Sequence, residues 1–329
     1  MTELRPSIIL AVLLTGAILV GSSGDLSAQT AMAGEQIAFI RNGDIWLMNP
    51  DGADQRPLVG GIQNAKGKLS WEPGNKRIVF SRSGSLQLKY PDGGGGNHRV
   101  YDLFFAFIDS TNNFWMGITE TLGAQSPEWS KDGSKVTFTY DVNGAMANST
   151  WPEYRVGFYD VKTRVISDIS LPRSSDALFA MTPTLSPDGS RVAFNLARFD
   201  GKQVIPIGIV VTSATKVTQT AEELMAAAKK LSGSTSPSWS PDGNWIAYVS
   251  SDLSNAGLYF IHADGTGKKL IYEPPAGITL AGSPPTWSPD SKRLAFGTLN
   301  GAIFTINSDG SNAKMISGPG SDTFPAWSR

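Results

Sequence analysis

Few side chains in this sequence could support histidine- or thiol-dependent chemistry. It contains two histidines and no cysteine, which excludes thiol catalysis, thiolate metal sites and a histidine-rich metal centre. His98 adjoins Arg99 after a glycine-rich stretch, and His262 precedes a turn sequence. No Gly-x-Ser-x-Gly element is present, which disfavours a serine hydrolase of that type. Paired carboxylates stay open, because acidic residues far apart in sequence can meet in a fold. The sequence favours binding over catalysis and indicates no cofactor and no bound metal.

Aromatic and arginine side chains offer a different chemistry, which is recognition of a partner. They occur in or beside the long connections of a repeated strand pattern, and tryptophan and arginine are common anchors of protein interfaces. The same residue types could also line a carbohydrate pocket. The candidate binding residues are His98, Arg99, Trp151, Arg155, Arg173 and Arg198.

The pattern that positions these residues is an internal repeat. Each copy has an anchor residue, a tight turn and a strand, as in Trp-Ser-Pro-Asp-Gly-Asn-Trp-Ile-Ala-Tyr. Proline presets φ, aspartate can bond the local backbone and glycine accepts a positive φ, so the turn is tight. The following strand alternates large and small apolar residues, which predicts that both of its faces are covered. The copies span residues 71–80, 129–138, 185–194, 239–248 and 287–296.

A third strand, an Asp-Gly hairpin turn and a short fourth strand recur in the same order after the second strand, and the third strand with its turn is clearest in residues 44–52, 257–265 and 302–310. Four antiparallel strands in a meander form one blade of a β-propeller. Trp327 is a sixth anchor, and Gly34–Phe39 supplies the turn glycine and second strand of the same blade. We therefore predict an all-β fold. It is a single six-bladed β-propeller over residues 34–329, closed by pairing of the C-terminal strand, Phe324–Arg329, with the N-terminal strands.

With these motifs, the sequence resembles the propeller repeats of TolB-type proteins. The shared signature is Trp-Ser-Pro-Asp-Gly, then a strand like Ile-Ala-Phe, then an Asn-x-Asp-Gly turn. The resemblance covers residues 34–329 and concerns the propeller part alone, because TolB carries an α/β domain before its propeller. It implies that the propeller binds a partner.

Residues 1–33 have the pattern of a secretory signal peptide. An uncharged apolar run extends from Ile8 to Val20, shorter than the roughly 20 residues that span a bilayer. Small residues follow it, with predicted cleavage after Ala28 or Ala33. We expect a periplasmic or secreted protein that is peripheral to a membrane at most.

The charge balance argues against a polyanionic partner. Lys and Arg number 28 and Asp and Glu number 29, for a formal net charge of −1. Nucleic-acid-binding domains normally carry a basic excess, so we expect no nucleic-acid partner. Two hypotheses follow. The first is an exported, monomeric, non-enzymatic propeller acting as a protein-binding platform, with a protein partner in the cell envelope. The alternative is a propeller that binds or cleaves polysaccharide, of lyase or glycosidase type, since the architecture supports both.

The long connections predict which face of the propeller is the binding surface. In an up-and-down blade, the second-to-third and blade-to-blade connections share one face, and here they are longest over the first four repeats counted from Trp71. Functional residues concentrate on such loops, so this face is the predicted binding surface. One connection has capping-box spacing at Thr220 and Glu223 and predicts a helix over Ala221–Leu231. That helix would either pack on its own blade or dock a partner.

Overall fold

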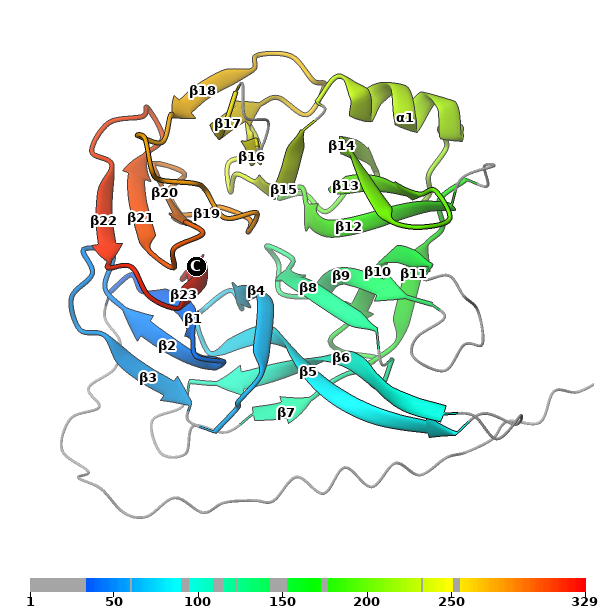
Figure 1. The fold of residues 1–329 in the computed structure, drawn as a ribbon, viewed down its shortest axis with the longest axis horizontal. Coiled ribbons are helices and arrows are strands. Elements are labelled where there is room, and N and C mark those ends of the chain that lie inside the picture. Colours follow the sequence, from blue (N-terminus) through cyan, green and yellow to red (C-terminus); the bar gives the residue numbers. More distant parts are fainter. Residues whose placement is uncertain are drawn as a thin grey trace, which may run out of the picture. The chain divides into compact units, whose positions relative to one another are not determined.

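Figure 1 shows the structure, a computed structural model, as a ribbon. The described residues are 34–59, 61–89, 95–108, 115–121, 123–142, 153–172, 177–231, 233–250 and 255–329. For residues 59, 86–89 and 95–98 the backbone alone is described. The predicted signal peptide and two candidate binding residues, Trp151 and Arg173, lie outside these ranges. Gly34–Arg329 forms one compact unit.

Within that unit, antiparallel sheets follow one another around a centre, which confirms the predicted six-bladed propeller (Figure 1). Blades are numbered from the anchor Trp71. Blade 1 comprises β4 (Ala65–Trp71), β5 (Arg77–Lys89), β6 (Gly95–Phe107) and β7 (Trp115–Gly117). Blade 2 comprises β8 (Ala124–Trp129), β9 (Lys135–Asp141), β10 (Tyr154–Asp160) and β11 (Ile166–Ile169). Blade 3 comprises β12 (Ala177–Leu185), β13 (Arg191–Phe199) and β14 (Val204–Ser213).

The remaining blades complete the ring. Blade 4 comprises β15 (Ser234–Trp239), β16 (Ile246–Ser250), β17 (Gly257–Ile261) and β18 (Lys269–Tyr272). Blade 5 comprises β19 (Thr286–Trp287), β20 (Arg293–Gly297), β21 (Ile303–Asn307) and β22 (Lys314–Ser317). Blade 6 comprises β23 (Asp322–Trp327), β1 (Ile37–Arg41), β2 (Asp44–Met48) and β3 (Arg56–Val59).

Blade 6 joins the two ends of the sequence, as predicted. β23 pairs with β1, with Trp327 opposite Ile37 and Asp322 opposite Arg41. The side chains of Arg41 and Asp322 also form an ion pair, with a 2.6 Å contact. The C-terminal strand therefore supplies the innermost strand of a blade whose other three strands are N-terminal.

The Ser-x-Asp part of the repeat builds the tight turn after the anchor. In blade 3, Ser186 Oγ donates to Asp188, and the backbone N–H of Arg191 donates to Ser186 Oγ (3.0 Å). The backbone N–H of Ser190 also donates to Asp188 Oδ1 (3.1 Å). These hydrogen bonds to the carboxylate, the one from Ser186 first, lower the pKa of Asp188 to about 2. The same pattern recurs at Ser130 and Asp132, at Ser240 and Asp242, and at Ser288 and Asp290.

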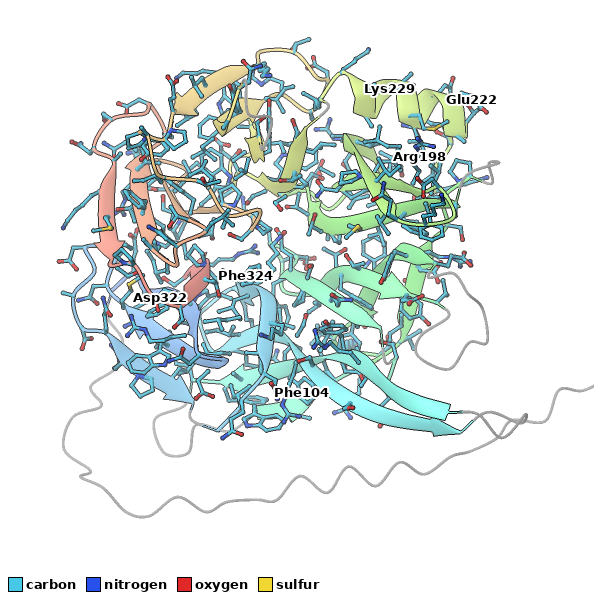
Figure 2. All side chains as sticks on the ribbon, in the orientation of Figure 1. Phe104, Arg198, Glu222, Lys229, Asp322 and Phe324 are labelled. Atoms are coloured by element: carbon cyan, nitrogen blue, oxygen red, sulfur yellow. The ribbon has the colours of Figure 1, made fainter. Side chains whose placement is uncertain are left out.

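Large and small residues alternate along the second strands because each strand is covered on both faces. In blade 4, Ile246 and Tyr248 pack in a cluster with Ala193 of blade 3. Ala247, between them, packs in a different cluster with Phe296 of blade 5. All five side chains are fully or almost fully buried. The predicted two-sided burial is confirmed, and Figure 2 shows side chains filling the space between neighbouring blades.

Blade 3 differs from the predicted four-stranded pattern. Its described part is a three-stranded sheet, and the helix α1 (Ala221–Lys229) packs against its outer strand β14 (Figure 1). A Cβ on Gly208 of β14 would lie 2.1 Å from the carbonyl oxygen of Ala228, so glycine permits this approach. The predicted capping box is present at Thr220 and Glu223. Because Leu224 and Ala228 are buried in the core of blade 3, the helix packs on its own blade. No helix in the described part of the chain is long and apolar enough to cross a membrane.

Blade 1 also departs from the predicted loops. The segment between Arg82 and Arg99 is among the long connections that the repeat pattern predicts. Instead, β5 and β6 continue as a paired ribbon from Arg77 opposite Phe107 out to Lys89 opposite Gly95. The ribbon extends outward from the ring in Figure 1. The sequence does not predict this pairing, because the glycines of the segment lower its strand propensity.

Candidate functional site

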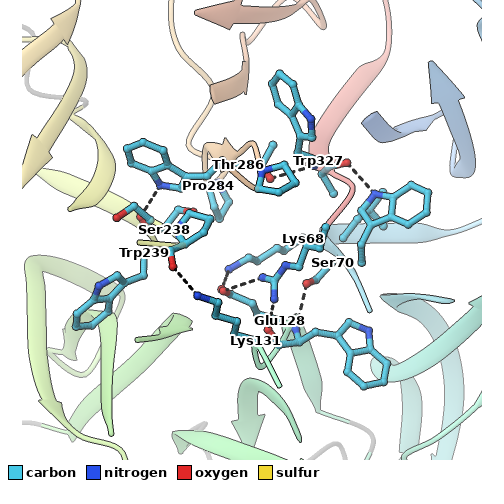
Figure 3. A pocket seen from close by; sticks show the side chains of 18 of the residues that line it. Lys68, Ser70, Glu128, Lys131, Ser238, Trp239, Pro284, Thr286 and Trp327 are labelled. Carbon is cyan, nitrogen blue, oxygen red and sulfur yellow. Dashed lines mark hydrogen bonds and ion pairs between the residues drawn. The ribbon is translucent and has the colours of Figure 1, made fainter. Parts of the chain in front are cut away.

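A cavity of about 270 Å³ lies where the first strands of all six blades meet (Figure 3). Its lining combines residues of β4, β8, β12, β15, β19 and β23 with residues of the first-to-second-strand turns. Four of these are the turn prolines Pro73, Pro187, Pro241 and Pro289. The cavity therefore lies at the tight-turn end of the ring's centre. We call it the central pocket.

The wall of the central pocket is held together by hydrogen bonds between blades. Hydroxyls of the residue before an anchor accept from the backbone N–H of the next anchor: Ser70 from Trp129 (3.1 Å), Thr184 from Trp239 (3.1 Å), Thr286 from Trp327 (3.0 Å). Two indoles bridge other blades, with Trp71 donating to the carbonyl of Ala326 (2.9 Å) and Trp287 to that of Ser238 (3.1 Å). These groups are already bonded within the wall, which makes the wall a rigid frame.

Glu128 is the charged member of this wall. It takes the position before the anchor in blade 2 and is 7% exposed. It forms an ion pair with Lys68 of blade 1, which is itself 9% exposed. Thr184 Oγ1 of blade 3 donates to Glu128 Oε1 (3.2 Å), and Lys68 Nζ lies 3.5 Å from the carbonyl oxygen of Pro183. Because both charges have polar partners, their burial is compensated. The pair connects three blades at the pocket floor.

Two further cations lie at the pocket mouth. Arg329 donates from Nη1 to the carbonyl oxygen of Trp129 (2.7 Å), and its Nη2 lies 3.4 Å from Glu128 Oε1. Lys131 donates from Nζ to the carbonyl oxygen of Pro241 (3.1 Å), so it reaches from the turn of blade 2 to that of blade 4. Figure 3 shows Lys68, Glu128 and Lys131 pointing into the pocket. The described lining thus carries three cationic side chains and one carboxylate.

The candidate residues from the sequence lie elsewhere. The described ones come from blades 1 to 3, and none of them lines the central pocket. Arg99 is exposed on the ribbon strand β6, beside His98, of which the backbone alone is described. Arg155 in β10 forms ion pairs with Glu153 (2.6 Å) and Asp168 (3.1 Å).

Burial acts to lower the pKa of the Arg155 guanidinium, but its hydrogen bonds with Glu153 and Asp168 outweigh burial and raise it. The guanidinium is therefore engaged within blade 2. Arg198 lies in β13, opposite Leu178 and Ile205, and is labelled in Figure 2. The candidate set stays a prediction of the long-loop face.

The pocket residues missed by sequence inspection are Lys68, Glu128, Lys131 and Arg329. One signal was visible. The residues before the six anchors are Ser70, Glu128, Thr184, Ser238, Thr286 and Ala326, so Glu128 is the single charged exception. Its partners come from other blades and carry no comparable signal.

The acidic groups of the central pocket bear on its chemistry. Among its described lining residues Glu128 is the one carboxylate, and its oxygens already have partners. Hydrolysis of a glycosidic bond commonly requires two carboxyl groups that flank the bond. Within the described part of the chain, no group of three or more His, Asp or Glu residues could hold a metal ion.

Comparisons with known proteins agree with this architecture. No family model matches the chain. TolB from Acinetobacter baumannii is similar in structure, with 16% sequence identity, a TM-score of 0.59, and coverage of 90% of this chain and 67% of that chain. The putative TolB from Agrobacterium tumefaciens has 13% sequence identity and a TM-score of 0.53, and the match covers 87% of this chain and 91% of that chain. A chain of the nidogen/laminin complex has 9% sequence identity and a TM-score of 0.52, and the match covers 89% of this chain and 98% of that chain. The predicted resemblance to TolB propellers is confirmed at the level of the fold.

Proposed function

We propose that this protein is a non-enzymatic, protein-binding propeller, exported to the cell envelope, whose partner docks at the central pocket. The observation that carries the proposal is the pocket itself, a concavity whose wall is held by hydrogen bonds between blades and whose mouth carries cationic side chains. Seven prolines line this concavity beside arginine, and arginine is a common anchor residue of protein interfaces. The likeness to TolB and to the nidogen/laminin chain supplies the fold alone.

The size of the pocket favours a protein over a polysaccharide. Sites that enclose a small molecule usually have about 300–1,000 Å³. The central pocket has about 270 Å³, which suits one or two side chains of a docked partner. The rest of the interface would then spread over the surrounding turns.

A steric block tests this function. Pro289 is an exposed rim residue, and Pro289→Trp would fill the mouth without changing any charge. Envelope extract is passed over immobilised wild-type protein, over P289W, and over a long-loop variant carrying Arg99→Gln and Arg198→Gln. Bound proteins are identified by mass spectrometry, and each variant is first checked for wild-type thermal unfolding.

We expect a partner that is retained by the wild type and by the long-loop variant and lost from P289W. A partner lost only from the long-loop variant would move the site to the face predicted from the sequence. Capture of the same proteins by all three forms, or of none, would contradict the proposal. Binding of uronate or neutral glycans in a parallel array, abolished in P289W, would favour the polysaccharide alternative.

A further inference from the structure

We infer that the central pocket recognises carboxylate side chains on an acidic segment of the partner, and that Arg329 and Lys131 are the residues that bind them. This inference rests on the proposed function and names the chemistry of the docked group. It starts from the charge of the pocket. The side chains of the described lining include three cations, Lys68, Lys131 and Arg329, and one carboxylate, that of Glu128, which leaves a positive side-chain excess beside the apolar prolines. Apolar walls focus such a field, because they exclude the water that would screen it.

The two mouth cations differ from Lys68 in how fully they are paired. Lys68 is buried and forms the close ion pair with Glu128. Arg329 makes its shortest hydrogen bond to a backbone carbonyl, that of Trp129, and contacts Glu128 only at 3.4 Å. Lys131 likewise bonds to the carbonyl of Pro241. A carboxylate is a stronger acceptor for a cationic donor than a neutral carbonyl, so an incoming carboxylate can replace these bonds.

Both mouth cations also have donors to spare and are accessible. A guanidinium has five N–H donors and an ammonium has three. The Arg329 side chain is 32% exposed, and Lys131 is exposed. Arg329 binds the carbonyl of Trp129, two positions before Lys131, so the two cations approach the same turn of blade 2. One acidic segment entering the mouth can therefore reach both.

The aspartates of the surrounding turns do not fill this role. Asp132 of the same blade 2 turn does not line the pocket, and it accepts hydrogen bonds from Ser130 (2.6 Å) and from Ser134 within its own turn. Asp188, Asp242 and Asp290 are held by their own turns in the same way. Their carboxylates are committed to the turns, and the cations at the mouth stay available.

An acidic peptide fits this site better than an anionic glycan does. The cations lie at the mouth, beside the prolines of the lining, and the cavity holds about 270 Å³. An extended segment with an acidic residue next to an apolar one can place the carboxylate at the mouth and the apolar side chain below it. A chain of uronate rings would place hydroxyl groups, and no apolar side chain, against the prolines of the lining.

A displayed library of random heptapeptides provides the probe. It is selected on the full chain and counter-selected on P289W, in which the mouth of the central pocket is blocked without a change of charge. Enriched peptides are synthesised, together with copies in which Asp and Glu become Asn and Gln. Their affinities are measured by fluorescence anisotropy for the wild type, for K131Q, for Arg329→Gln, and for Lys202→Gln as a control. Lys202 is an exposed lysine in the turn between β13 and β14, outside the pocket. R329Q is also checked by thermal unfolding, while K131Q changes only an exposed turn residue.

We expect the selected peptides to be rich in Asp and Glu and to bind about tenfold more weakly to K131Q and R329Q, as is usual for a lost charge-assisted hydrogen bond. The amide copies should lose affinity likewise, raised salt should weaken binding, and K202Q should match the wild type. Selected peptides without acidic enrichment, or with equal affinity for K131Q, would overturn the inference. Preferential binding of tri-galacturonate over every peptide would overturn it too. If P289W still abolishes capture of the partner while K131Q and R329Q do not weaken it, the docking site stands and only its carboxylate chemistry falls.

Discussion

Blades 5 and 6 follow the same plan, but the chain runs through the turn of blade 5 and is interrupted in that of blade 6. In blade 5, Ser288 N donates to the carbonyl of Arg293 (2.8 Å), and Arg293 N donates to Ser288 Oγ (2.9 Å). In blade 6, Ser328 N donates to the carbonyl of Gln36 (2.8 Å), and Gln36 N donates to Ser328 Oγ (2.8 Å). The two hydrogen bonds that pair the strands across the turn therefore form without a continuous turn.

The two turns differ in what holds the segment after the serine. In blade 5, Asp290 accepts from Ser288 Oγ (2.6 Å) and from Lys292 N (3.0 Å), so the turn is stabilised by its own residues. In blade 6, the next residue is Arg329, which reaches outward. Its backbone N–H donates to Asn75 Oδ1 of blade 1 (2.7 Å), and its side chain bonds to blade 2. The closing turn is thus held by neighbouring blades, and the same arginine that holds it lines the central pocket.

Among the variants that compare the two blades, deletion of Phe324–Arg329 should cause the largest loss of stability. It removes most of β23, including the buried Trp327, and leaves β1 with an unpaired edge. Losing one buried tryptophan alone costs about 3–5 kcal/mol, against a typical domain stability of about 5–15 kcal/mol. We expect the cooperative thermal transition, followed by circular dichroism, to be lost.

A circular permutant is the matched control. Joining Arg329 to Gly34 through one added glycine gives the closing turn the five-residue spacing that Ser288 and Arg293 have, and the chain is reopened between Asp290 and Ser291. This form should unfold cooperatively near the wild-type temperature. An unchanged transition in the deletion variant would refute closure by strand pairing.

The anchors of the two blades test whether the closing interface is packed as well as a continuous one. Trp327 is 2% exposed and Trp287 is 6% exposed. Replacing either with alanine should cost about 3–5 kcal/mol, since the cost of a large-to-small change depends on burial and on how far the site relaxes. Urea denaturation measures both. A loss for W327A below half of that for W287A would mean that the closing blade is looser than blade 5.

Most of this architecture could be predicted from the sequence, because it depends on local patterns. The alternation at Ile246–Tyr248, the capping box at Thr220 and the sixth anchor at Trp327 each act through neighbours in sequence. Closure was predictable for the same reason, since the interrupted blade repeats a known pattern. The ribbon of β5 and β6 and the three-stranded blade 3 were not, because glycines and a helix took the place of recognisable strand signals.

The central pocket was beyond such patterns. Lys68, Glu128 and Arg329 come from blades 1, 2 and 6, and they meet only because the ring brings their strands to one centre. The long loops predict a binding surface on the opposite face, because elaborated connections are common sites of function. The unusual residue was Glu128, whose position holds small residues in the other blades.

Removing the turn serines compares the two closures more gently. Ser328→Ala leaves the backbone N–H of the buried Gln36 without its acceptor, which costs about 1–3 kcal/mol. Ser288→Ala likewise leaves the backbone N–H of Arg293 without its acceptor, and it also removes the hydroxyl that donates to Asp290. We expect S288A to lose more stability than S328A in urea denaturation. Equal losses would show that the aspartate adds nothing to the turn.

The smallest effect concerns pH. The hydrogen bond from Ser186, together with those from Ser190, lowers the pKa of Asp188 from 3.8 to about 2 in the folded protein. A depressed folded pKa gives stability that is complete above the unfolded value and disappears as the pH falls through the folded value. Asp188→Asn should therefore lower the melting temperature slightly at pH 6 and have a much smaller effect near pH 2. A melting-temperature shift for D188N that is independent of pH would mean that the negative charge of this carboxylate does not contribute to stability.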